Sequence, residues 1–517
     1  MKVVIIGSGV AGLTAAAALG QMGHAVTVFE QSQQVGGVTA SYEQVGYRWD
    51  LGQLLLEGFG PGEPVGKILA ELGLAEEVKI RADDRDYIFP DFAIRKPGQF
   101  GGVLWRMERL KQVFPEEAKG LAHYWKDYLR FTSVMTLARR MENTSGLARL
   151  AMKARLYLKL LPFLPKQNWS AQRLMDDYFQ SEKLKAVFIS ILADFFTRPS
   201  QFIGLGVFAL NPETVYDSRM PKDLAPDCEQ IYLYSVYGGV GRLVDALVRK
   251  IQAQAGIIHT SRVVMKIIVE NNHVTGVVDE LGVSTPADVV VASGGARETF
   301  LKLVGEENLP ADFIAHVKQI PLMDSIFMVH LGVDFNPSKY VRGVCTYFYG
   351  TYDIEGGVED AHSGLYHEGR LGFVVHVPSL YSPQMAPEGR HALTIYTICP
   401  DRLKDGSWSE RKEEFADRLV AYAEKHIPGL REHTQVRVVL TPEDFRKRTH
   451  LDHHAFGGIA PLMGAWKAPH QAPVNGLWFV GAQSESGGGV SAVMVAAYKA
   501  AKKAGKEFAT KAARSTL

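Results

Sequence analysis

Three glycines and one glutamate near the start of the chain have the types and spacing needed to bind a dinucleotide. Gly7, Gly9 and Gly12 follow the pattern G-x-G-x-x-G, and Glu30 follows them. In this pattern the first glycine permits a tight turn, the second lets the backbone approach a pyrophosphate, and the third allows the helix to pack closely on the strand. An acidic residue about 20 residues further on accepts hydrogen bonds from ribose hydroxyls. These residues therefore predict the recognition of a dinucleotide.

A strand, a helix and a second strand must position these residues. Val3–Ile6 is a run of β-branched residues, typical of a strand buried in a parallel sheet. The Ala- and Leu-rich run Leu13–Leu19 predicts a helix whose N-terminus favours an anion. The second strand, Ala25–Phe29, ends just before Glu30. We expect no secretory signal peptide after Lys2, because spaced glycines and a second strand follow the first apolar stretch.

The composition argues against several functional classes. The chain has 517 residues, more than one ordinary domain, and its 57 basic and 56 acidic residues give a net charge of +1, so we expect no nucleic-acid partner. Cys228, Cys345 and Cys399 form neither a C-x-x-C pair nor a disulfide framework, which favours a cytoplasmic protein. We expect no metal site, and we expect the adjacent His453 and His454 in a loop or at the surface.

A glycine pair that follows Glu30 indicates which dinucleotide is bound. Gly36 and Gly37 follow Glu30 and precede a short return strand within Gly46–Gly52. This pattern resembles the flavoprotein fold of the amine oxidase and phytoene desaturase superfamily. The resemblance implies FAD as the cofactor. It also implies an α/β fold with a Rossmann-like, glutathione-reductase-type FAD-binding domain and an interleaved α+β substrate domain.

The C-terminal segment Asn475–Ala504 repeats the arrangement of strand, glycine turn and helix. A buried strand, Leu477–Val480, leads to Gly487–Gly489 and then to an Ala-rich helix. Backbone N–H groups at such a helix start bind anions. The segment resembles the C-terminal flavin motif of carotenoid desaturases and carotenoid isomerases. Many flavoproteins of this fold carry Gly-Asp after the strand, whereas this chain has Gly481 and Ala482 and lacks that side-chain contact.

A third segment, Tyr237–Gly294, completes the predicted FAD-binding unit. It contains a glycine loop, an amphipathic helix (Leu243–Gln254) and a strand (Ala287–Gly294) expected under the nucleotide. The resemblance implies a backbone contact to the adenine within Val264–Ile267. For the whole chain the predicted FAD contacts are Gly7, Ser8, Gly9, Val10, Ala11, Gly12, Glu30, Gln31, Gly36, Gly37, Val38, Val264, Gly294, Gly481, Ala482, Gly488, Gly489 and Val490.

The resemblance also divides the chain into two discontinuous domains. We expect residues 1–90, 226–300 and 436–517 in the FAD-binding domain, and residues 91–225 and 301–435 in the substrate domain. Four segments resemble the carotenoid isomerase and phytoene desaturase branch in their order and spacing, namely Gln112–Leu121, Asp324–Asp334, Val377–Thr397 and Leu440–Thr449. Two departures leave the reaction open: Val38 stands where bacterial desaturases commonly carry arginine, and Ser293 where relatives often carry asparagine.

A basic amphipathic helix is predicted in Asn143–Gln172, a stretch without acidic residues. On a helix its apolar residues share one face, and cations gather on the other; the apolar residues are Leu147, Leu150, Ala154, Leu158 and Leu161, and the cations are Arg149, Lys153, Arg155 and Lys159. This pattern is typical of interfacial membrane binding. The alternative is an ordinary surface helix that covers the substrate domain.

The function that we expect is that of an FAD-dependent oxidoreductase acting on a long apolar isoprenoid or polyene, by desaturation or by flavin-dependent cis–trans isomerisation. The alternatives are a saturase or an amine-oxidase-like enzyme on another substrate, and a non-catalytic flavin-binding protein. No catalytic residue is predicted, because the cofactor supplies the difficult step. We expect a cytoplasmic protein with peripheral contact to the inner face of a membrane. The sequence leaves the oligomeric state open.

Overall fold

The computed structural model describes residues 1–515 except 53, 143, 343 and 344. The predicted dinucleotide-binding segment forms β1 (Lys2–Ile6), α1 (Val10–Gln21) and β2 (Ala25–Phe29). The bounds of β2 are those predicted. The helix α1 begins earlier than predicted because Gly9, in an extended conformation, serves as its N-cap. The basic segment predicted from Asn143 onward begins on a residue outside the described ones.

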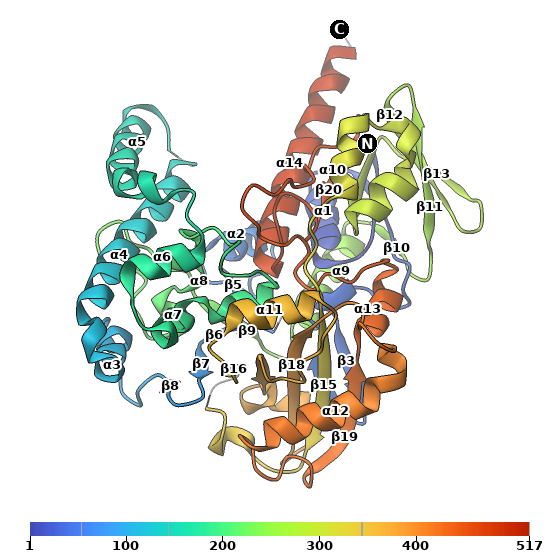
Figure 1. The fold of residues 1–517 in the computed structure, drawn as a ribbon. Coiled ribbons are helices and arrows are strands. Elements are labelled where there is room, and N and C mark those ends of the chain that lie inside the picture. The colour runs from blue at the N-terminus through green and yellow to red at the C-terminus, as the bar shows by residue number, and fades with distance from the viewer. Residues whose placement is uncertain (53, 143, 343–344, 516–517) are drawn as a thin grey trace.

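Five parallel strands from three separate stretches of chain form the first sheet (Figure 1). Their order is β10-β2-β1-β14-β20, where the added strands are β10 (Ile257–His259), β14 (Val289–Ser293) and β20 (Leu477–Val480). Each neighbouring pair is parallel. The carboxyl ends of β1, β14 and β20 therefore meet at one edge, where ligands bind in sheets of this kind.

The two faces of this sheet are buried by different elements. Val3 and Ile5 of β1 pack against the helices α1, α9 (Gly241–Ala253) and α14 (Val490–Ser515). Val4 points to the other face and packs with a three-stranded antiparallel sheet and a helix, namely β11 (Val264–Glu270), β12 (His273–Asp279), β13 (Ser284–Pro286) and α10 (Ala311–Lys318). This arrangement of layers confirms the predicted α/β, Rossmann-like fold class.

A second, mixed sheet contains seven strands in the order β19-β15-β18-β17-β16-β7-β8. The strands are β7 (Arg85–Ile88), β8 (Ala93–Ile94), β15 (Ser325–Val333), β16 (Cys345–Tyr349), β17 (Gly372–His376), β18 (His391–Cys399) and β19 (Thr434–Leu440). β7 lies before residue 90 and β19 extends past residue 435, so this sheet includes residues from both predicted domains. The division of the chain at these two positions stays a prediction.

Helices cover both faces of the second sheet. One face packs against α12 (Trp408–Glu424). The other packs against a helical region that Figure 1 shows to the side of the two sheets, made of α3 (Trp105–Val113), α4 (Ala118–Met141), α5 (Gly146–Leu160), α6 (Ala171–Tyr178), α7 (Glu182–Ile189) and α8 (Gly206–Leu210). Two further helices, α11 (Ile354–His362) and α13 (Pro442–Thr449), flank this sheet.

Shorter elements connect the two sheets. The return strand predicted after the glycine pair is β4 (Tyr47–Asp50), which forms a hairpin with β3 (Ser41–Gln44). A small antiparallel sheet has the order β5-β9-β6, formed by β5 (Leu56–Glu57), β6 (Ile80–Asp83) and β9 (Leu233–Val236), and α2 (Pro64–Glu71) lies between β5 and β6 in the chain.

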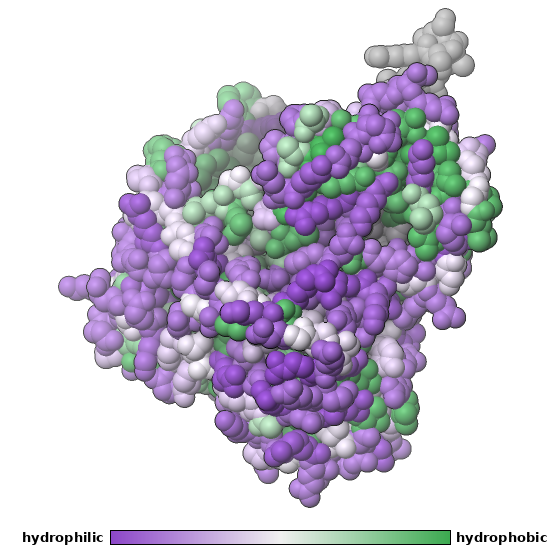
Figure 2. Space-filling model, turned by 45° about the vertical axis from the view of Figure 1, so that its right-hand side comes forward, coloured by the Kyte–Doolittle hydropathy of each residue, from purple (hydrophilic) through white to green (hydrophobic). Residues whose placement is uncertain are grey.

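The predicted amphipathic helix is present as α5, and both its sides carry apolar residues. Met152, Leu156 and Leu160 are partly buried, on the side opposite the predicted apolar stripe. The predicted stripe itself is exposed, with 85% of Leu147 and 68% of Leu158 accessible to solvent. Hydrophilic residues cover most of the face of the molecule in Figure 2. Within the described part of the chain, none of the helices combines the length and the apolar character that crossing a bilayer requires.

Candidate active site

The turn between β1 and α1 is the centre of the predicted site. Gly7 has a φ of +92°, and a Cβ added there would lie 2.5 Å from the carbonyl oxygen of Ser293, so glycine is required. A Cβ at Gly12 would overlap the carbonyl oxygen of Gly7. At Gly9 the nearest atom to an added Cβ is the Ser293 Oγ, 3.8 Å away. Packing therefore requires Gly7 and Gly12, whereas Gly9 borders open space.

The N-terminus of α1 faces this open space without a protein group to cap it. Gly9 is the N-cap, no side chain accepts a hydrogen bond from the first turn, and that turn contains no acidic residue. The N–H groups of Val10 and Ala11 are among those that an α-helix leaves without an intrahelical partner, and the helix dipole is positive at this end. These properties match the binding of a pyrophosphate.

Glu30 is held in a fixed position beside the turn. Its carboxylate accepts hydrogen bonds from the N–H (2.9 Å) and hydroxyl (2.5 Å) of Ser8 and from the N–H of Ser32 (2.8 Å). Two carboxylate oxygens have about four acceptor positions, so one remains for a further donor such as a ribose hydroxyl. The neighbouring Gln31 donates from Nε2 to the carbonyl oxygen of Thr449 (2.6 Å), which joins the end of β2 to α13.

The pair Gly36 and Gly37 lies directly against the turn Gly7–Gly12. The N–H of Gly36 donates to the carbonyl oxygen of Ser8 (3.0 Å). The carbonyl oxygen of Gly37 accepts a hydrogen bond from the Arg448 Nε (2.9 Å), a contact that the sequence interpretation missed. Val38 packs against a large aromatic cluster in the second-sheet region. The loop therefore joins the dinucleotide turn to the other half of the molecule.

The C-terminal glycine turn closes the opposite side of the site. Gly481, with a φ of +107°, follows β20, and its added Cβ would have the Ser293 Oγ 3.8 Å away as nearest atom. The carbonyl oxygen of Ala482 accepts a hydrogen bond from the N–H of Ile459 (3.1 Å). Ser293 of β14 therefore lies between the first and the last glycine turns.

Open space also lies beside two other predicted glycines. Apart from the adjacent residues of the chain, no atom of the described residues is within 4 Å of a Cβ added at Gly294 or Gly489. At Gly488, in contrast, an added Cβ would overlap the carbonyl oxygen of Gly457. Val490 begins α14, as the predicted strand–turn–helix arrangement requires.

The predicted adenine contact also lies near Glu30. The N–H of Arg262 donates to the carbonyl oxygen of Glu30 (2.9 Å), and Val264, two positions further on, begins β11. The structure thus brings the predicted residues of all three stretches to the carboxyl edge of one sheet. An uncapped helix, an anchored carboxylate and glycine-bordered space fit the pyrophosphate and ribose of a dinucleotide.

An aromatic surface of the second sheet continues from this site. The aromatic face, as we call it, consists of Tyr87, Tyr347, Tyr349, Tyr396 and Met328, whose side chains point to the same side of the sheet and belong to one buried cluster. Val38 and Phe456 pack against this cluster, and Leu54 and Leu55 belong to it. Because Gly457 contacts Gly488, the aromatic face lies next to the C-terminal glycine turn.

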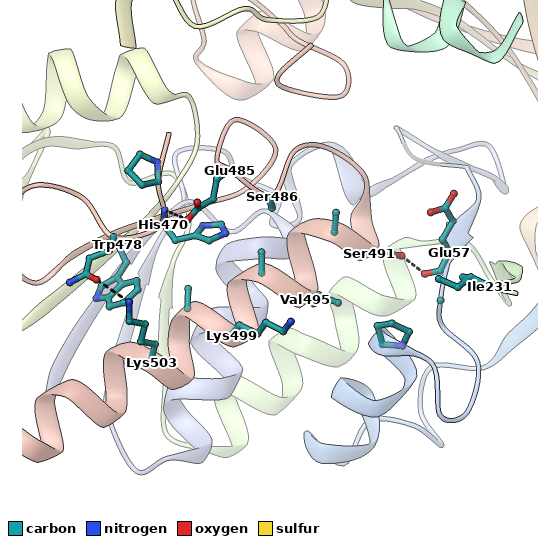
Figure 3. A pocket seen from close by; sticks show the side chains of 17 residues that line it. Glu57, Ile231, His470, Trp478, Glu485, Ser486, Ser491, Val495, Lys499 and Lys503 are labelled. Carbon is teal, nitrogen blue, oxygen red and sulfur yellow. Dashed lines mark hydrogen bonds between the residues drawn. The ribbon is translucent and has the colours of Figure 1, made fainter. Parts of the chain in front are cut away.

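A pocket of about 660 Å³ lies elsewhere, along the outer side of α14 (Figure 3). Trp478 of β20, Ile231 and the α14 side chains of Val495 and Lys499 line it. None of the predicted cofactor residues lines this pocket, and Trp478 is not part of the aromatic face. Tyr396 belongs to the aromatic face, whereas Trp478 lines this separate pocket.

The predicted loop position of His454 is confirmed. His454 lies in a loop but is buried, since its Nδ1 contacts the Ser325 hydroxyl (2.6 Å) and its ring stacks on Phe445. Burial lowers its pKa to about 3, so the ring is neutral. The described residues contain no group of three or more His, Cys, Asp or Glu side chains placed to hold a metal ion.

Known proteins are similar to this chain in sequence and in fold over most of its length. The family model for flavin containing amine oxidoreductases matches residues 10–504. A phytoene desaturase (neurosporene-forming) from Cereibacter sphaeroides is 26% identical over 97% of this chain and 94% of its own length. A chloroplastic prolycopene isomerase from Daucus carota is 25% identical over 95% of this chain and 77% of its own.

A solved structure agrees with these sequence matches. The crystal structure of an oxidoreductase from Methanosarcina mazei superimposes with a TM-score of 0.62 at 20% identity, covering 97% of this chain and all of the other. Together with the glycine-bordered dinucleotide site, the match over residues 10–504 identifies the cofactor and the type of reaction. The chain belongs to the family of flavin-containing amine oxidoreductases and is an FAD-dependent oxidoreductase.

Proposed function

We propose that this enzyme acts on a long apolar isoprenoid or polyene that lies across the aromatic face. The observation that carries the proposal is the contact between the C-terminal glycine turn and this face, through Gly457, Phe456 and the Phe456–Tyr396 ring pair (5.9 Å between centroids). Two relatives named for carotenoid reactions, the desaturase and the isomerase, support this substrate class.

In this proposal the predicted cofactor residues hold FAD in three parts. The α1 N-terminus and Gly9 bind the pyrophosphate, Glu30 binds the adenosine ribose, and the backbone near Val264 contacts the adenine. Val38 and the Gly488–Gly489 turn would hold the flavin end. The open space beside Gly9 and Gly489 supports this course, since a backbone without side chains lets a ligand approach closely.

The residues of this chain supply orientation and exclude water. FAD, when bound, supplies hydride exchange for desaturation, and in its reduced form it supports cis–trans isomerisation. The rings of Tyr87, Tyr347 and Tyr349 pack edge-on or stacked, with 5.2 to 6.2 Å between centroids, and form a rigid apolar surface for the chain of the substrate. An apolar environment of this kind binds a polyene without a polar anchor along its length.

An amine substrate fits this surface less well than a polyene does. Arg85 lies over the ring of Tyr347, with 5.4 Å between the guanidinium carbon and the ring centroid. A protonated amine at the aromatic face would be repelled by this guanidinium, and the low dielectric of a buried site strengthens the repulsion.

The decisive experiment compares the mass of a polyene before and after reaction. We would incubate the FAD-loaded enzyme anaerobically with carotenoid hydrocarbons, in its oxidised and its chemically reduced form, and analyse the products by chromatography and mass spectrometry. Loss of two hydrogens with the oxidised form identifies a desaturase, unchanged mass with the reduced form an isomerase, and gain of two hydrogens a saturase. If no polyene reacts while a small amine bleaches the flavin, the proposal fails.

We further propose that α5 binds the surface of an anionic membrane, which would deliver such a substrate. The exposed stripe of Leu147, Leu150, Leu158 and Leu161 supports this, because a helix that merely covered the protein would bury it. Arg149 and Lys153 are exposed beside it and would each contribute about 1 kcal/mol near anionic lipids.

Liposome flotation tests the membrane proposal. The wild type should float with anionic liposomes, and L150E/L158E should not, because the exposed stripe then carries charge. Lys266→Glu, which changes an exposed cation of β11, is the matched control and should float as the wild type does. Equal flotation of all three proteins, or none by the wild type, would show that α5 has no role at a membrane.

A further inference from the structure

The cationic side chain of Arg85 lies at the edge of the aromatic face, and it takes part in no close ion pair among the described residues. Arg85 begins β7 and points to the same side of the sheet as Tyr347. Its Nε atom and the hydroxyl of Tyr87 are both buried without a hydrogen bond. No carboxylate in the described part of the chain lies within ion-pairing distance, 4 Å, of this guanidinium. An arginine in this state is costly to bury.

The polar groups around Arg85 include the hydroxyls of Tyr87 and Tyr347 and the carboxyl of Asp194. Asp194, whose carboxyl interacts electrostatically with Arg85, accepts a hydrogen bond from the Tyr396 hydroxyl (3.4 Å). Burial raises the pKa of Asp194 to about 7, although the charge of Arg85 and hydrogen bonds from Tyr396 and Tyr347 oppose the rise. In its protonated form this carboxyl can also donate a hydrogen bond.

Both side chains remain partly accessible although protein surrounds them. Arg85 and Asp194 have intermediate exposure, yet protein atoms enclose both. The cluster is connected to the cofactor side by a short path, in which Gly488 contacts Gly457, Phe456 pairs with Tyr396, and Tyr396 bonds Asp194.

We propose that Arg85 binds a carboxylate at the end of the apolar substrate. A guanidinium forms paired hydrogen bonds with a carboxylate, and the tyrosine hydroxyls would complete its coordination. The substrate class is then a polyene or isoprenoid acid whose hydrocarbon part lies over the aromatic face. This inference rests on the proposed function, because it takes the aromatic face as the place where the apolar chain binds.

The test compares an acid with its ester. Retinoic acid and methyl retinoate share one polyene and differ in charge at one end. Equilibrium dialysis of the FAD-loaded full chain should show the acid bound about 10- to 100-fold more tightly than the ester, as expected for a charge-assisted pair. Arg85→Met should remove this preference by weakening the acid alone, and Arg85→Lys should retain part of it.

Arg437→Met is the matched control, since Arg437 lies on the same sheet but is paired with Asp417 and Glu413 outside the aromatic face. It should leave the preference unchanged. Equal binding of acid and ester by the wild type would overturn the inference, and so would an equal loss of both ligands in Arg85→Met. If Arg85→Met does not fold, the wild-type preference and Arg85→Lys still decide.

The two proposals fail in different ways. If the enzyme converts hydrocarbon polyenes but does not distinguish acid from ester, the carboxylate inference is wrong and the proposed function stands. If acid and ester are distinguished while no polyene reacts in either redox state, the proposed reaction is wrong, and Arg85 binds a carboxylate ligand of another kind.

Discussion

Alanine substitutions at Gly9 and Gly12 should separate a requirement of the fold from a requirement of the cofactor. In apo-protein, Gly9→Ala should be as stable as the wild type or more stable by about 0.4–1 kcal/mol, because its φ of −60° and ψ of 163° suit alanine and the unfolded chain loses entropy. The added Cβ has no neighbour closer than the Ser293 Oγ at 3.8 Å. Gly12→Ala should lower the unfolding free energy by about 1–3 kcal/mol, since its Cβ overlaps the Gly7 carbonyl oxygen.

Gly9→Ala, which should leave the stability of the apo-protein unchanged or raised, should weaken the binding of FAD. If the pyrophosphate lies against Gly9, the same steric cost of about 1–3 kcal/mol falls on the complex, and the Kd should rise about 5- to 150-fold. Urea unfolding of deflavinated protein measures the first effect, and fluorimetric titration with FAD measures the second. If Gly9→Ala binds FAD with wild-type affinity, the pyrophosphate does not lie against Gly9. If Gly9→Ala is less stable than the wild type in the absence of FAD, the space beside Gly9 is not open.

Three further predictions concern charged groups. Glu30→Arg should yield colourless protein on purification, since it removes the ribose acceptor, and full FAD occupancy measured by absorbance would contradict this. Between about pH 4 and 7 folded Asp194 binds more protons than the unfolded chain, so urea stability should fall as pH rises, and Asp194→Asn should flatten that part of the curve; an unchanged curve would contradict the raised pKa. Arg106→Met should lower the free energy of unfolding by about 3–5 kcal/mol, because it leaves the fully buried Glu213 unpaired. Urea unfolding measures this loss, and a free energy close to that of the wild type would contradict the prediction.

Local patterns predicted the first sheet well. The bounds of β2 and β20 agree with the runs Ala25–Phe29 and Leu477–Val480, because strands buried in a parallel sheet are rich in apolar and β-branched residues. The positions of the three glycine turns at one sheet edge also followed from the sequence. The loop position of His454 was predicted but its burial was not, because a buried histidine in a polar loop has no distinguishing pattern.

The substrate side could not be predicted in the same way. Arg85 reaches Tyr347 only because β7 pairs with β16, a strand far away in the chain. Asp194 and Tyr396 are likewise brought together by tertiary packing. Arg448, which bonds the Gly37 carbonyl oxygen, lies in a charged run that looks like an exposed helix end. No local periodicity encodes such contacts, so the structure was needed to find them.

The two apolar sides of α5 determine how the protein behaves during purification. Since Met152 and Leu156 are partly buried on the protein side, the helix cannot turn to hide Leu147 and Leu158 without exposing that side instead. In lipid-free buffer only an amphiphile or a second copy of the chain can cover the leucines. We therefore expect the elution volume on gel filtration to depend on protein concentration and on detergent, so the number of subunits should be measured with lipid or detergent present.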